Sequence, residues 1–590
     1  MEPIVGIDLG TTNSEIAFII NESAQVIKEK DNGIVPSCVG INPAGQIVVG
    51  QEAKNQAVVE PDKTILSVKR LMGSDQPVYL DKKAYRPQEI SAMILKALKE
   101  RAERSLQTQI SNAIITVPAY FADAQRQATR EAGEIAGLNV IRILNEPTAA
   151  ALAYESDQTQ QQKILVYDLG GGTFDVSIVK IEEGVVEVLS STGDSQLGGD
   201  DFDQKIIDLL MNHLKDQHHL DVSDDPQTMA RLKRTAEAAK IELSSAPFVL
   251  IEEDHIGKKR LKDIHLTYEL SRQTFEETIA DDFQRTMEAV NKALDDAKCL
   301  AGDIDKIILV GGSTRIPVLS RLLAEKFGKM PHAEIDPDLC VALGSAIQGG
   351  REMGISSSKV LLDITPYTFG TSAVGDIGGQ PVMDMFVPLI HRNSKLPFHH
   401  SKVFYTMYEN QEAVDITVFQ GENSHAYDNI LIGKYKFDLS KAPANSPIIL
   451  RFDLDINGIL KIQGIEKKTD RQINAVIENA FASFTEGEIK QSKEKIELLW
   501  NSDRPEPEDS EISRPSSESD ADADEDLNMP SDIKAVVKEA KQKLNQASIE
   551  DQEDIINLIE DIIDAVKSNQ LDKLKDLKEE LSDILFYIDE

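Results

Sequence analysis

Two similar segments of the sequence each contain the end of an apolar run, then an aspartate, and then a turn rich in Gly and Thr. They span residues 7–12 (IDLGTT) and 167–173 (YDLGGGT), about 160 residues apart. Glycines in such turns let backbone N–H groups and hydroxyls approach a phosphate closely. One loop alone is more often an ordinary turn with an Asp cap, because Gly-rich loops are weak signals. The pair reverses that preference and predicts two related half-domains with a phosphate between their turns.

The carboxylates beside these turns suit a magnesium ion. No Gly-x-x-x-x-Gly-Lys-Ser/Thr string occurs in the sequence, so a Walker-type phosphate loop is excluded as the source of nucleotide binding. Asp8, Asp168 and Asp175 could instead hold hydrated Mg²⁺, which keeps most of its waters and needs only one or two carboxylates besides phosphate oxygens.

Lys69 and Glu146 are further candidates for the chemistry. A glutamate near the phosphates can orient or deprotonate water, and a lysine can neutralise charge that develops on the transferred group. The local sequence leaves alternatives open for both residues. Glu146 precedes Pro147 and an Ala-rich run, as at the start of a helix, and Lys69 taken alone is a solvated surface lysine.

Two more segments carry candidate nucleoside contacts. Glu237, Lys240 and Ser244 are spaced to share one helix face, where their stems and polar ends could grip a nucleoside. By itself such a face is usually only solvated. The 311–315 turn (GGSTR) follows an apolar strand and allows close approach, and its arginine could stack on a base. Only the conjunction of all these segments favours a nucleotide site.

The hydrophobic periodicity divides the chain into domains. Up to about residue 353, short β-branched runs alternate with helical patterns, which predicts an α/β domain over 1–355. Residues 356–363 separate this domain from the next pattern, as a linker would. From 364 to 482 the period is two, and Asn457-Gly458 between alternating runs (450–456 and 460–462) marks a hairpin. We expect an antiparallel β domain with one solvated face.

The C-terminal part has three segments. A helix is predicted over 483–500, with Thr485 and Glu488 spaced as a capping box. Within the acidic linker 501–529, residues 501–526 hold 11 acidic and 2 basic residues, a composition typical of disorder. Apolar residues then return at helical spacing over 530–590 and predict a bundle of three antiparallel helices.

Charge and composition exclude several classes of protein. The formal net charge of −37 argues against a nucleic-acid or anionic-membrane partner, which would need clustered Lys and Arg. No apolar run approaches the roughly 18 residues of a membrane span, and the N-terminus lacks a leader pattern, so we expect a cytosolic protein. Cys38, Cys299 and Cys340 form no CxxC pair and are expected to be buried thiols.

Four ordered motifs resemble those of the 70-kilodalton heat-shock chaperones, particularly the bacterial DnaK-like members. They are GIDLGTTNS (6–14), NEPTAAALAY (145–154), DLGGGTFDVS (168–177) and ILVGGSTRIP (308–317), and the similarity continues through NQEAVDITVFQGE (410–422). It covers roughly residues 1–500. The resemblance implies a multidomain protein: an α/β ATPase domain like that of actin and hexokinase, an antiparallel β-sandwich that binds peptides, and an α-helical C-terminal lid.

The implied function is that of an ATP-dependent molecular chaperone of the stress response. It would bind short apolar extended segments of unfolded proteins and release them under control of ATP binding and hydrolysis. The implied cofactors are ATP or ADP, Mg²⁺ and K⁺. The implied partners are unfolded polypeptides, a J-domain co-chaperone and a nucleotide-exchange factor, and the chain would act as a monomer.

The resemblance also assigns roles to individual residues. The residues implied at the phosphates, the Mg²⁺ and the attacking water are Asp8, Lys69, Glu146, Asp168, Thr173 and Asp175, with Lys69 essential for hydrolysis. The residues implied around the nucleotide are Gly10, Thr11, Thr12, Asn13, Gly170, Gly171, Gly172, Gly198, Gly199, Glu237, Lys240, Ser244, Gly311, Gly312, Ser313, Arg315 and Asp338. A relay to the interdomain surface would use Pro118 and Arg126. The interdomain linker would be Val360, Leu361, Leu362 and Asp363. The peptide pocket would include Val374, Met407, Val414 and Ile416.

Some segments depart from the family pattern. The stretch from Lys69 to Ser91 is shorter than in many bacterial relatives, which leaves exchange-factor contacts in that lobe open. The linker has one Leu fewer, and Thr371 stands where a larger aliphatic is usual. The acidic linker replaces part of the usual lid helix, so we expect looser lid closure and faster peptide release with ADP.

Three other interpretations compete with a general chaperone. A sugar or glycerol kinase could use the same ATPase architecture but leaves the β domain unexplained. An actin-like filament protein would need no peptide pocket. A specialised family member, serving a few clients or acting chiefly as a holdase, is not separated from a general chaperone by the sequence.

Overall fold

The computed structural model describes residues 2–154, 161–182, 184–259, 262–332, 334–355, 360–466, 471–476 and 484–501, together with 536, 540, 558, 562, 577, 578 and 581. Its contacts divide the chain into two compact units, residues 1–504 and 505–590. The predicted acidic linker and C-terminal helical bundle lie outside the continuously described residues. No helix in the described part of the chain is long and apolar enough to span a membrane. Cys38, Cys299 and Cys340 are free and buried, as expected.

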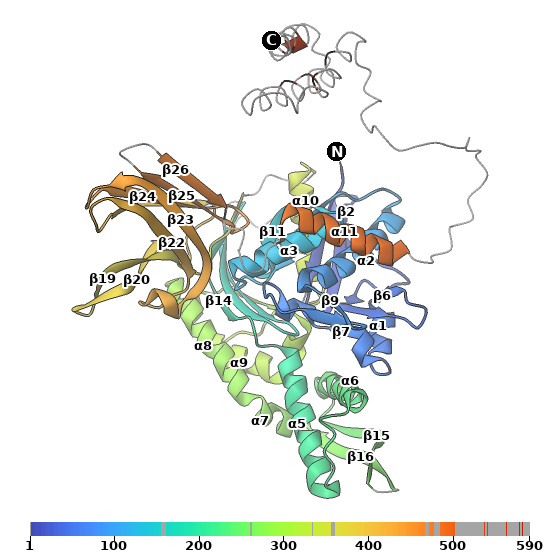
Figure 1. Cartoon of the computed structure of the whole chain (residues 1–590). Helices are drawn as coiled ribbons and strands as arrows, with labels where there is room; N and C mark the ends of the chain where they lie inside the picture. The colour runs from blue at the N-terminus through green and yellow to red at the C-terminus, as the bar shows by residue number, and fades with distance from the viewer. Residues whose placement is uncertain are drawn as a thin grey trace. The chain divides into compact units, whose positions relative to one another are not determined.

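The first half-domain is built on a six-stranded sheet of order β11-β10-β1-β2-β3, with β4 paired to β2 (Figure 1). β1 is parallel to β10 and antiparallel to β2. The apolar run in β1 is almost entirely buried, as expected for a strand that is covered on both faces. The strands are β1 (Ile4–Leu9), β2 (Asn13–Ile20), β3 (Ser23–Val26), β4 (Val35–Pro36), β10 (Asn112–Val117) and β11 (Asn139–Asn145).

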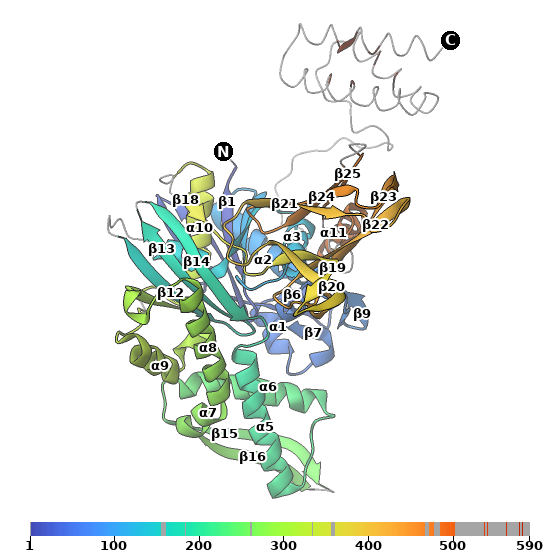
Figure 2. The same cartoon turned by 90° about the vertical axis from the view of Figure 1, so that its left-hand side faces the viewer.

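The second half-domain repeats the order β10-β1-β2-β3 as β17-β12-β13-β14, and β18 is added at the β14 edge of its sheet (Figure 2). Here β12 is parallel to β17 and antiparallel to β13. The predicted pair of related half-domains is therefore confirmed at the level of strand order. The strands are β12 (Gln162–Leu169), β13 (Phe174–Glu182), β14 (Val185–Asp194), β17 (Lys306–Val310) and β18 (Val360–Leu362).

Helices and small sheets complete the nucleotide domain, a name used here for residues 2–355. α10 packs on β1, β2 and α4, and Ala17 packs against Ala342 and Ala346 of α10. The helices are α1 (Gln51–Gln56), α2 (Pro87–Leu106), α3 (Asp123–Ile135), α4 (Glu146–Ala153), α5 (Gly199–His218), α6 (Pro226–Leu243), α7 (Arg272–Thr278), α8 (Ala280–Asp296), α9 (Pro317–Phe327) and α10 (Cys340–Glu352). The remaining strands are β5 (Cys38–Ile41), β6 (Ile47–Val49), β7 (Thr64–Leu66), β8 (Val78–Leu80), β9 (Lys83–Tyr85), β15 (Phe248–Lys259) and β16 (Lys262–Ser271).

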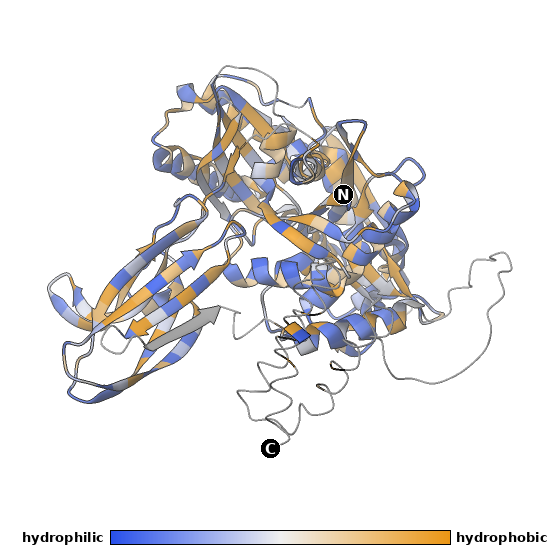
Figure 3. Cartoon of the chain, turned by 90° about the horizontal axis from the view of Figure 1, so that it is seen from above, coloured by the Kyte–Doolittle hydropathy of each residue, from blue (hydrophilic) through white to orange (hydrophobic). Residues whose placement is uncertain are grey.

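The β domain, residues 364–476, contains two antiparallel four-stranded sheets of order β20-β19-β22-β23 and β21-β24-β25-β26. Figure 3 shows apolar and polar residues alternating along these strands, and one core of Phe, Leu, Ile and Val side chains joins both sheets. The predicted antiparallel β domain is thus confirmed. Its strands are β19 (Phe369–Ile377), β20 (Gln380–Ile390), β21 (Phe398–Tyr405), β22 (Gln411–Gln420), β23 (Ile430–Ala442), β24 (Pro447–Leu454), β25 (Leu460–Glu466) and β26 (Arg471–Val476).

The hairpin predicted at Asn457-Gly458 joins β24 to β25. The expected strand over 450–456 is two residues too long, because β24 ends at Leu454. The Asp455 carboxylate accepts hydrogen bonds from the N–H groups of Asn457 and Ile459 at 2.8 and 3.0 Å. A carboxylate that caps its own backbone in this way favours a turn over a strand.

The predicted helix near 485–500 is α11 (Glu486–Asn501). Its capping box is present, since the Glu488 carboxylate accepts from the N–H and hydroxyl of Thr485 at 2.8 Å each. Ile496 and Trp500 are buried in the core of the first half-domain, and Lys495 pairs with Glu89 of α2 at 3.0 Å. In this structure α11 therefore lies on the nucleotide domain.

Candidate functional site

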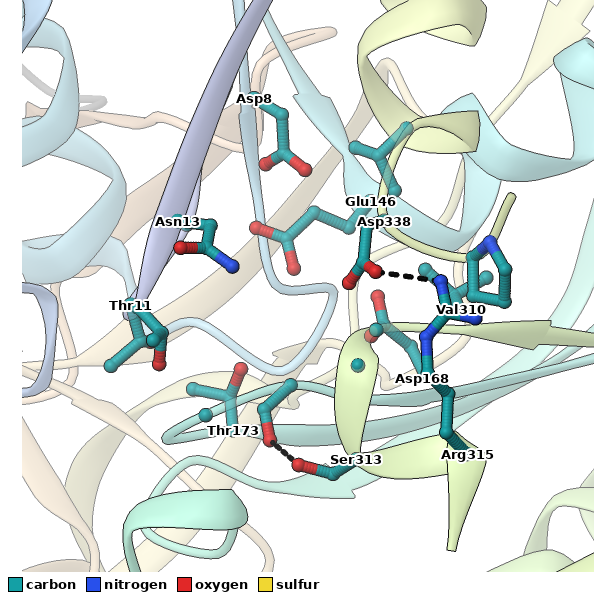
Figure 4. A pocket seen from close by; sticks show the side chains of 18 of the residues that line it. Asp8, Thr11, Asn13, Glu146, Asp168, Thr173, Val310, Ser313, Arg315 and Asp338 are labelled. Carbon is teal, nitrogen blue, oxygen red and sulfur yellow. Dashed lines mark hydrogen bonds and ion pairs between the residues drawn. The ribbon is translucent and has the colours of Figure 1, made fainter. Parts of the chain in front are cut away.

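A cavity of 350 Å³ opens where the two half-domains meet, and the turns predicted to hold a phosphate line it (Figure 4). Both half-domains contribute the residues that the sequence singled out. Those on the cavity wall are Asp8, Gly10, Thr11, Thr12, Asn13, Lys69, Glu146, Asp168, Gly170, Gly171, Thr173, Glu237, Lys240, Ser244, Gly311, Gly312, Ser313, Arg315 and Asp338. Of the nucleotide-binding residues implied by the resemblance, Gly172, Gly198 and Gly199 are not on that wall. Asp175 is likewise absent from it.

The glycine turns pack too closely for side chains. A Cβ at Gly10 would stand 2.0 Å from the Asn13 carbonyl oxygen, and one at Gly171 would stand 1.8 Å from the Thr12 hydroxyl. The Gly199 N–H donates to the Gly170 carbonyl at 2.9 Å. Gly198 and Gly199 thus support the second turn from behind, which accounts for their place outside the cavity wall.

Lys69 is not a solvated lysine, and that interpretation is wrong. Its ammonium lies 2.5 Å from the Glu146 carboxylate, and both side chains are less than 10% exposed. Burial alone would lower the pKa of Lys69, but Glu146 and Asp8 outweigh burial and raise it. Glu146 also begins α4, before Pro147. The helix-start interpretation is therefore confirmed, and the role of Glu146 in the chemistry stays a prediction.

Asp8, Asp168 and Asp175 gather beside this ion pair. The Thr116 hydroxyl donates to Asp8 at 2.9 Å, whereas Asp175 accepts from the N–H groups of Ala119 and Tyr120 at 3.1 and 3.0 Å. Burial, followed by repulsion from Glu146, raises the pKa of Asp8 and of Asp175 to about 7. The same two causes raise the pKa of Asp168 well above its usual range.

These carboxylates fit a hydrated magnesium ion. Their mutual repulsion is relieved by a cation, and hard oxygen donors are what Mg²⁺ prefers. Within the described residues, no three acidic, histidine or cysteine side chains converge closely enough to hold a metal by themselves. The arrangement suits an ion that keeps its waters and takes phosphate oxygens, rather than one held in a closed protein cage.

The nucleoside side of the cavity is formed by α6 and the 311–315 turn. The predicted face of α6 is confirmed for Glu237 and Lys240, and Ser244 caps the helix end. Glu237 pairs with Lys54 at 2.8 Å and Lys240 with Asp203 at 2.8 Å. The partners of both residues, Lys54 and Asp203, are not on the cavity wall. The Arg315 guanidinium is held by Asp336 and Asp338 at 2.6 and 2.8 Å.

A chain of hydrogen bonds leaves the cavity through Arg126. Asp175 holds the backbone of Ala119 and Tyr120, directly after Pro118. The Arg126 guanidinium donates to the Ala119 carbonyl at 2.9 Å and to the Asn145 side chain at 2.7 Å. Arg126 is buried. Arg126 therefore connects the backbone held by Asp175 with Asn145, and Pro118 directly precedes that backbone.

The linker continues this chain. The Asn145 amide donates to the Asp363 carboxylate at 2.8 Å, and the Thr148 hydroxyl donates to it at 3.3 Å. The three residues before Asp363 form β18, which pairs in parallel with β14. Leu361 packs against a core of the nucleotide domain, while Val360 is 53% exposed. In this structure the predicted linker is an edge strand of the second half-domain.

The residues predicted for the peptide pocket have unequal environments. Val374 and Met407 are about half exposed at 46% and 49%. Val414 is partly buried and Ile416 is buried, and both contact the core of the β domain. The Thr371 hydroxyl donates to the Thr417 carbonyl at 2.7 Å, which gives a polar partner to the residue that departs from the family pattern.

Asp123 is a buried carboxylate at the contact between α3 and the β domain. It is 1% exposed, and its N–H donates to the Gln420 side chain at 3.4 Å. Burial raises the pKa of Asp123 to about 7; the Leu460 backbone and Arg126 lower the pKa, and Asp455 raises it. The docked form therefore takes up a proton below pH 7 that a separated, solvated Asp123 would release.

We predict that this domain contact weakens as pH rises from about 4 to about 7 and then levels off, because the ionised carboxylate is disfavoured only while buried. Asp123→Asn should remove that dependence. At pH 8 we expect the β18 amides of the variant to be at least tenfold better protected from hydrogen exchange than those of wild type, because each pKa unit of the shift corresponds to about tenfold. Comparing both chains at the same pH cancels the intrinsic exchange rates. Equal protection of the two at pH 8 would contradict the prediction.

Sequence reasoning missed several residues of the cavity. Glu15, whose side chain is 2% exposed, lies on the wall, and burial followed by repulsion from Asp8 raises its pKa well above the usual range. Lys54 and Asp203 lie outside the wall and are the ion-pair partners of Glu237 and Lys240. Glu15 lies two residues after the predicted Asn13 in β2, so both project from the same face of the strand. That spacing could have identified Glu15. The apolar wall residues are Ile241, Val310, Ile316, Pro337 and Val341.

Comparisons with known proteins agree over almost the whole chain. A family model described as Hsp70 protein matches residues 4–81 and 77–588. The chain is 42% identical to chaperone protein DnaK of Thermosipho melanesiensis over an alignment that covers 98% of this chain and 95% of that relative. It is 41% identical to chaperone protein DnaK of Thermosipho africanus and 40% identical to that of Thermotoga neapolitana, with the same coverage.

Proposed function

This chain belongs to the Hsp70 family and is an ATP-dependent chaperone, and from that premise we propose that it hydrolyses ATP in the cavity between its half-domains and transmits the nucleotide state to the β domain. The buried Lys69–Glu146 pair at 2.5 Å carries this proposal. A buried ion pair beside three carboxylates contributes little to stability, and such a cluster of buried charges in a cavity is typical of a functional site. A phosphate that develops negative charge is such a ligand.

Each residue of the cavity has a proposed role. The turns at Gly10 and Gly170 cradle the phosphates, and Lys69 offsets the charge that grows on the transferred phosphoryl group. Glu146 and Thr173 orient the attacking water. Bound Mg²⁺, which Asp8, Asp168 and Asp175 would hold largely through water, supplies further charge neutralisation. We also propose that K⁺ contributes to nucleotide binding.

The nucleoside is proposed to lie between α6 and the 311–315 turn. Glu237 and Lys240 sit where ribose hydroxyls could replace part of their present ion pairing. The guanidinium of Arg315, held flat by Asp336 and Asp338, offers its face to a base. Ser244 adds a hydroxyl at the end of the helix. These contacts select a nucleotide rather than free phosphate.

Transmission is proposed to run from Asp175 through Arg126 and Asn145 to Asp363. A shift of Asp175 on nucleotide exchange alters the loop that Arg126 holds, and that loop also meets the β domain, because the Tyr367 hydroxyl donates to the Tyr120 carbonyl at 3.0 Å. β18 is the element with two states, either paired to β14 or released. Inverting such an equilibrium from 1:99 to 99:1 takes about 5.5 kcal/mol of differential nucleotide binding.

The client is proposed to be a short extended apolar segment bound near Val374, Met407, Val414 and Ile416. Burying one Leu-like side chain gains about 1.5–3 kcal/mol, and each strand-like hydrogen bond adds about 1 before ordering costs. The sum suits an affinity near micromolar, about −8 kcal/mol. Met407 can adapt to varied side chains because its thioether is flexible and polarizable.

Further parts of the proposal rest on the family alone. We propose a J-domain co-chaperone and a nucleotide-exchange factor as partners, action as a monomer, and a cytoplasmic location. The domain boundaries and the helical lid over 530–590 also stay predictions.

Because the family match extends through the β domain, the kinase and filament alternatives lose their support. A client-specific or holdase member remains the second candidate, because the family match does not separate it from a general chaperone.

Dissociation of a fluorescent apolar peptide tests the coupling. We expect release to be at least tenfold faster with ATP than with ADP, because ATP favours the conformation with β18 paired. Lys69→Ala should still release the peptide quickly with ATP, since ATP binding rather than hydrolysis opens the peptide site. Because the variant does not hydrolyse ATP, its peptide release should stay fast over the time in which the wild type completes a turnover. Equal dissociation rates with both nucleotides in the wild type would overturn the coupled chaperone in favour of a holdase.

A further inference from the structure

A second cavity, of 280 Å³, adjoins the nucleotide cavity and is formed by both half-domains. The two cavities share Thr11, Thr12 and Glu237. The first half-domain contributes α1 and the segments around it, and the second contributes the facing parts of α5 and α6. Figures 1 and 2 show α1 and α6 side by side. None of the roles proposed above uses the part of this wall that lies beyond the three shared residues.

The exposed surface of the second cavity is mainly apolar. Pro36 and Leu66 of the first half-domain contribute to it together with Ile207, Met229 and Ala230 of the second. Cavities that bind small molecules are typically lined in this way, with a few polar groups that fix the orientation of the ligand. The second cavity therefore has the surface of a ligand site, and its charged groups indicate which ligand it takes.

The charged groups of this wall leave one ammonium group without a carboxylate. Asp200, Asp203 and Glu237 are the acidic side chains of the wall, and each is already held by a hydroxyl or an ammonium group. The partner of Glu237 is Lys54, at 2.8 Å. Lys233 is only partly exposed, yet it pairs with no carboxylate in the described part of the chain.

The charge of Lys233 acts on the interior of the cavity. Cys38, a buried wall residue, shows this, because burial raises the pKa of its thiol to about 12 while the charges of Lys54 and Lys233 oppose that rise. An ammonium group without a partner above an apolar wall favours a ligand with one negative charge and an apolar body.

A ligand in this cavity would also affect the nucleotide. Polar contacts join the half-domains here: Lys54 pairs with Glu237 at 2.8 Å, and the Ser67 hydroxyl donates to Asp200 at 2.6 Å. A nucleotide that contacts both half-domains leaves when such contacts break. A ligand that needs both walls binds only while the half-domains are together, and it therefore favours that arrangement by mass action.

We propose that the second cavity binds a medium-chain aliphatic monocarboxylate, with its chain along the apolar wall and its carboxylate at Lys233, and that the bound acid slows nucleotide release. The wall holds no aromatic residue on which a flat ring could stack, and Met229 adapts to a flexible chain. The effect on release rests on the nucleotide site proposed above, whereas binding of the acid does not.

Equilibrium dialysis of radiolabelled decanoate against the full chain tests the binding. It is done without nucleotide and with a saturating apolar peptide, which occupies the peptide pocket. Wild type should bind one decanoate per chain, and Lys233→Met should bind it at least about tenfold more weakly, because a charged hydrogen bond is lost. No carboxylate depends on Lys233, so this variant leaves no buried charge unpaired.

Two further variants locate the bound acid. Lys233→Arg keeps the charge and should bind decanoate like wild type. Ala230→Phe fills part of the cavity and should abolish binding although Lys233 is intact. Equal decanoate affinity of wild type, Lys233→Met and Ala230→Phe would overturn the site.

Release of fluorescent ADP, followed by stopped flow, tests the regulatory part. Decanoate at about ten times its Kd should slow release at least about threefold in wild type but not in Lys233→Met. Lys292→Met, which removes a charge from the exposed face of α8, should respond like wild type. Acetate carries the charge without the chain and should leave the rate unchanged.

Unchanged or faster ADP release with decanoate bound would overturn the regulatory role of the second cavity. Failure of the wild type to bind ADP would instead refute the nucleotide site, because the dialysis measures decanoate binding without nucleotide. The two proposals thus fail in distinguishable ways.

Discussion

Replacing Lys69 by Ala should slow single-turnover ATP hydrolysis by at least about a hundredfold, while ATP affinity stays within about tenfold of wild type. A preorganised donor that meets developing charge typically contributes 10²–10³ in rate. Lys69 has the required preorganisation, because Glu146 holds its ammonium at 2.5 Å in a buried place. The loss should therefore appear in the chemical step rather than in binding.

The measurement is a single-turnover assay with radiolabelled ATP, together with calorimetric ATP binding. Removing Lys69 leaves Glu146 buried without its partner, a change that can cost about 3–5 kcal/mol of stability. Thermal unfolding of the variant and of Lys69→Met/Glu146→Gln, which removes both charges, accounts for that cost. Lys63→Ala, which loses only a surface pair with Glu60, should hydrolyse ATP at the wild-type rate. Wild-type single-turnover hydrolysis by a folded Lys69→Ala chain would refute the role of Lys69.

The second large effect is expected at the linker. Leu361→Asp should abolish the stimulation of ATP hydrolysis by peptide while ATP affinity stays within about twofold of wild type. Leu361 packs against a core of the nucleotide domain and stands opposite Val186 of β14. A carboxylate there would be desolvated without a partner when β18 pairs. The paired state would be lost, although the cavity lies elsewhere.

Steady-state hydrolysis with and without a saturating apolar peptide measures this effect. Val360→Asp is a matched control, because it adds the same charge to the same strand at a position that is 53% exposed. It should lose less of the stimulation than Leu361→Asp. Retained stimulation in Leu361→Asp, or an equal loss in both variants, would show that pairing of β18 does not carry the signal.

Local sequence patterns predicted the helices, strands and turns whose formation depends on residues close together in the chain. The alternation around Asn457-Gly458 identified the hairpin, and Thr485 with Glu488 identified the start of α11. The strand ending at Leu454 was predicted too long, because side-chain capping by Asp455 competes with period-two alternation. The face of α6 that carries Glu237 and Lys240 follows from helical spacing, so the sequence also placed these residues correctly.

The roles of single charged residues were not decided locally. The sequence around Lys69 is equally compatible with a surface position. Only the tertiary structure brings Glu146, which lies 77 residues further along the chain, into contact with Lys69. Glu15 belongs to none of the motifs, and only its alternation with Asn13 along the strand could have identified it. Its place on the cavity wall depends on burial and on the register that sets it opposite Asp8.

The sequence by itself determined the two half-domains, the glycine turns between which the cavity opens, the antiparallel β domain and the family. These follow from periodicity and from backbone conformations that each segment carries within itself. The tertiary structure alone decided which ion pairs are buried, that the segment 360–362 is an edge strand, and that Arg126 and Asn145 connect Asp175 with Asp363. Burial and pairing are properties of contacts between residues far apart in the chain, and the free energy of a charge depends on them more than on its neighbours in sequence.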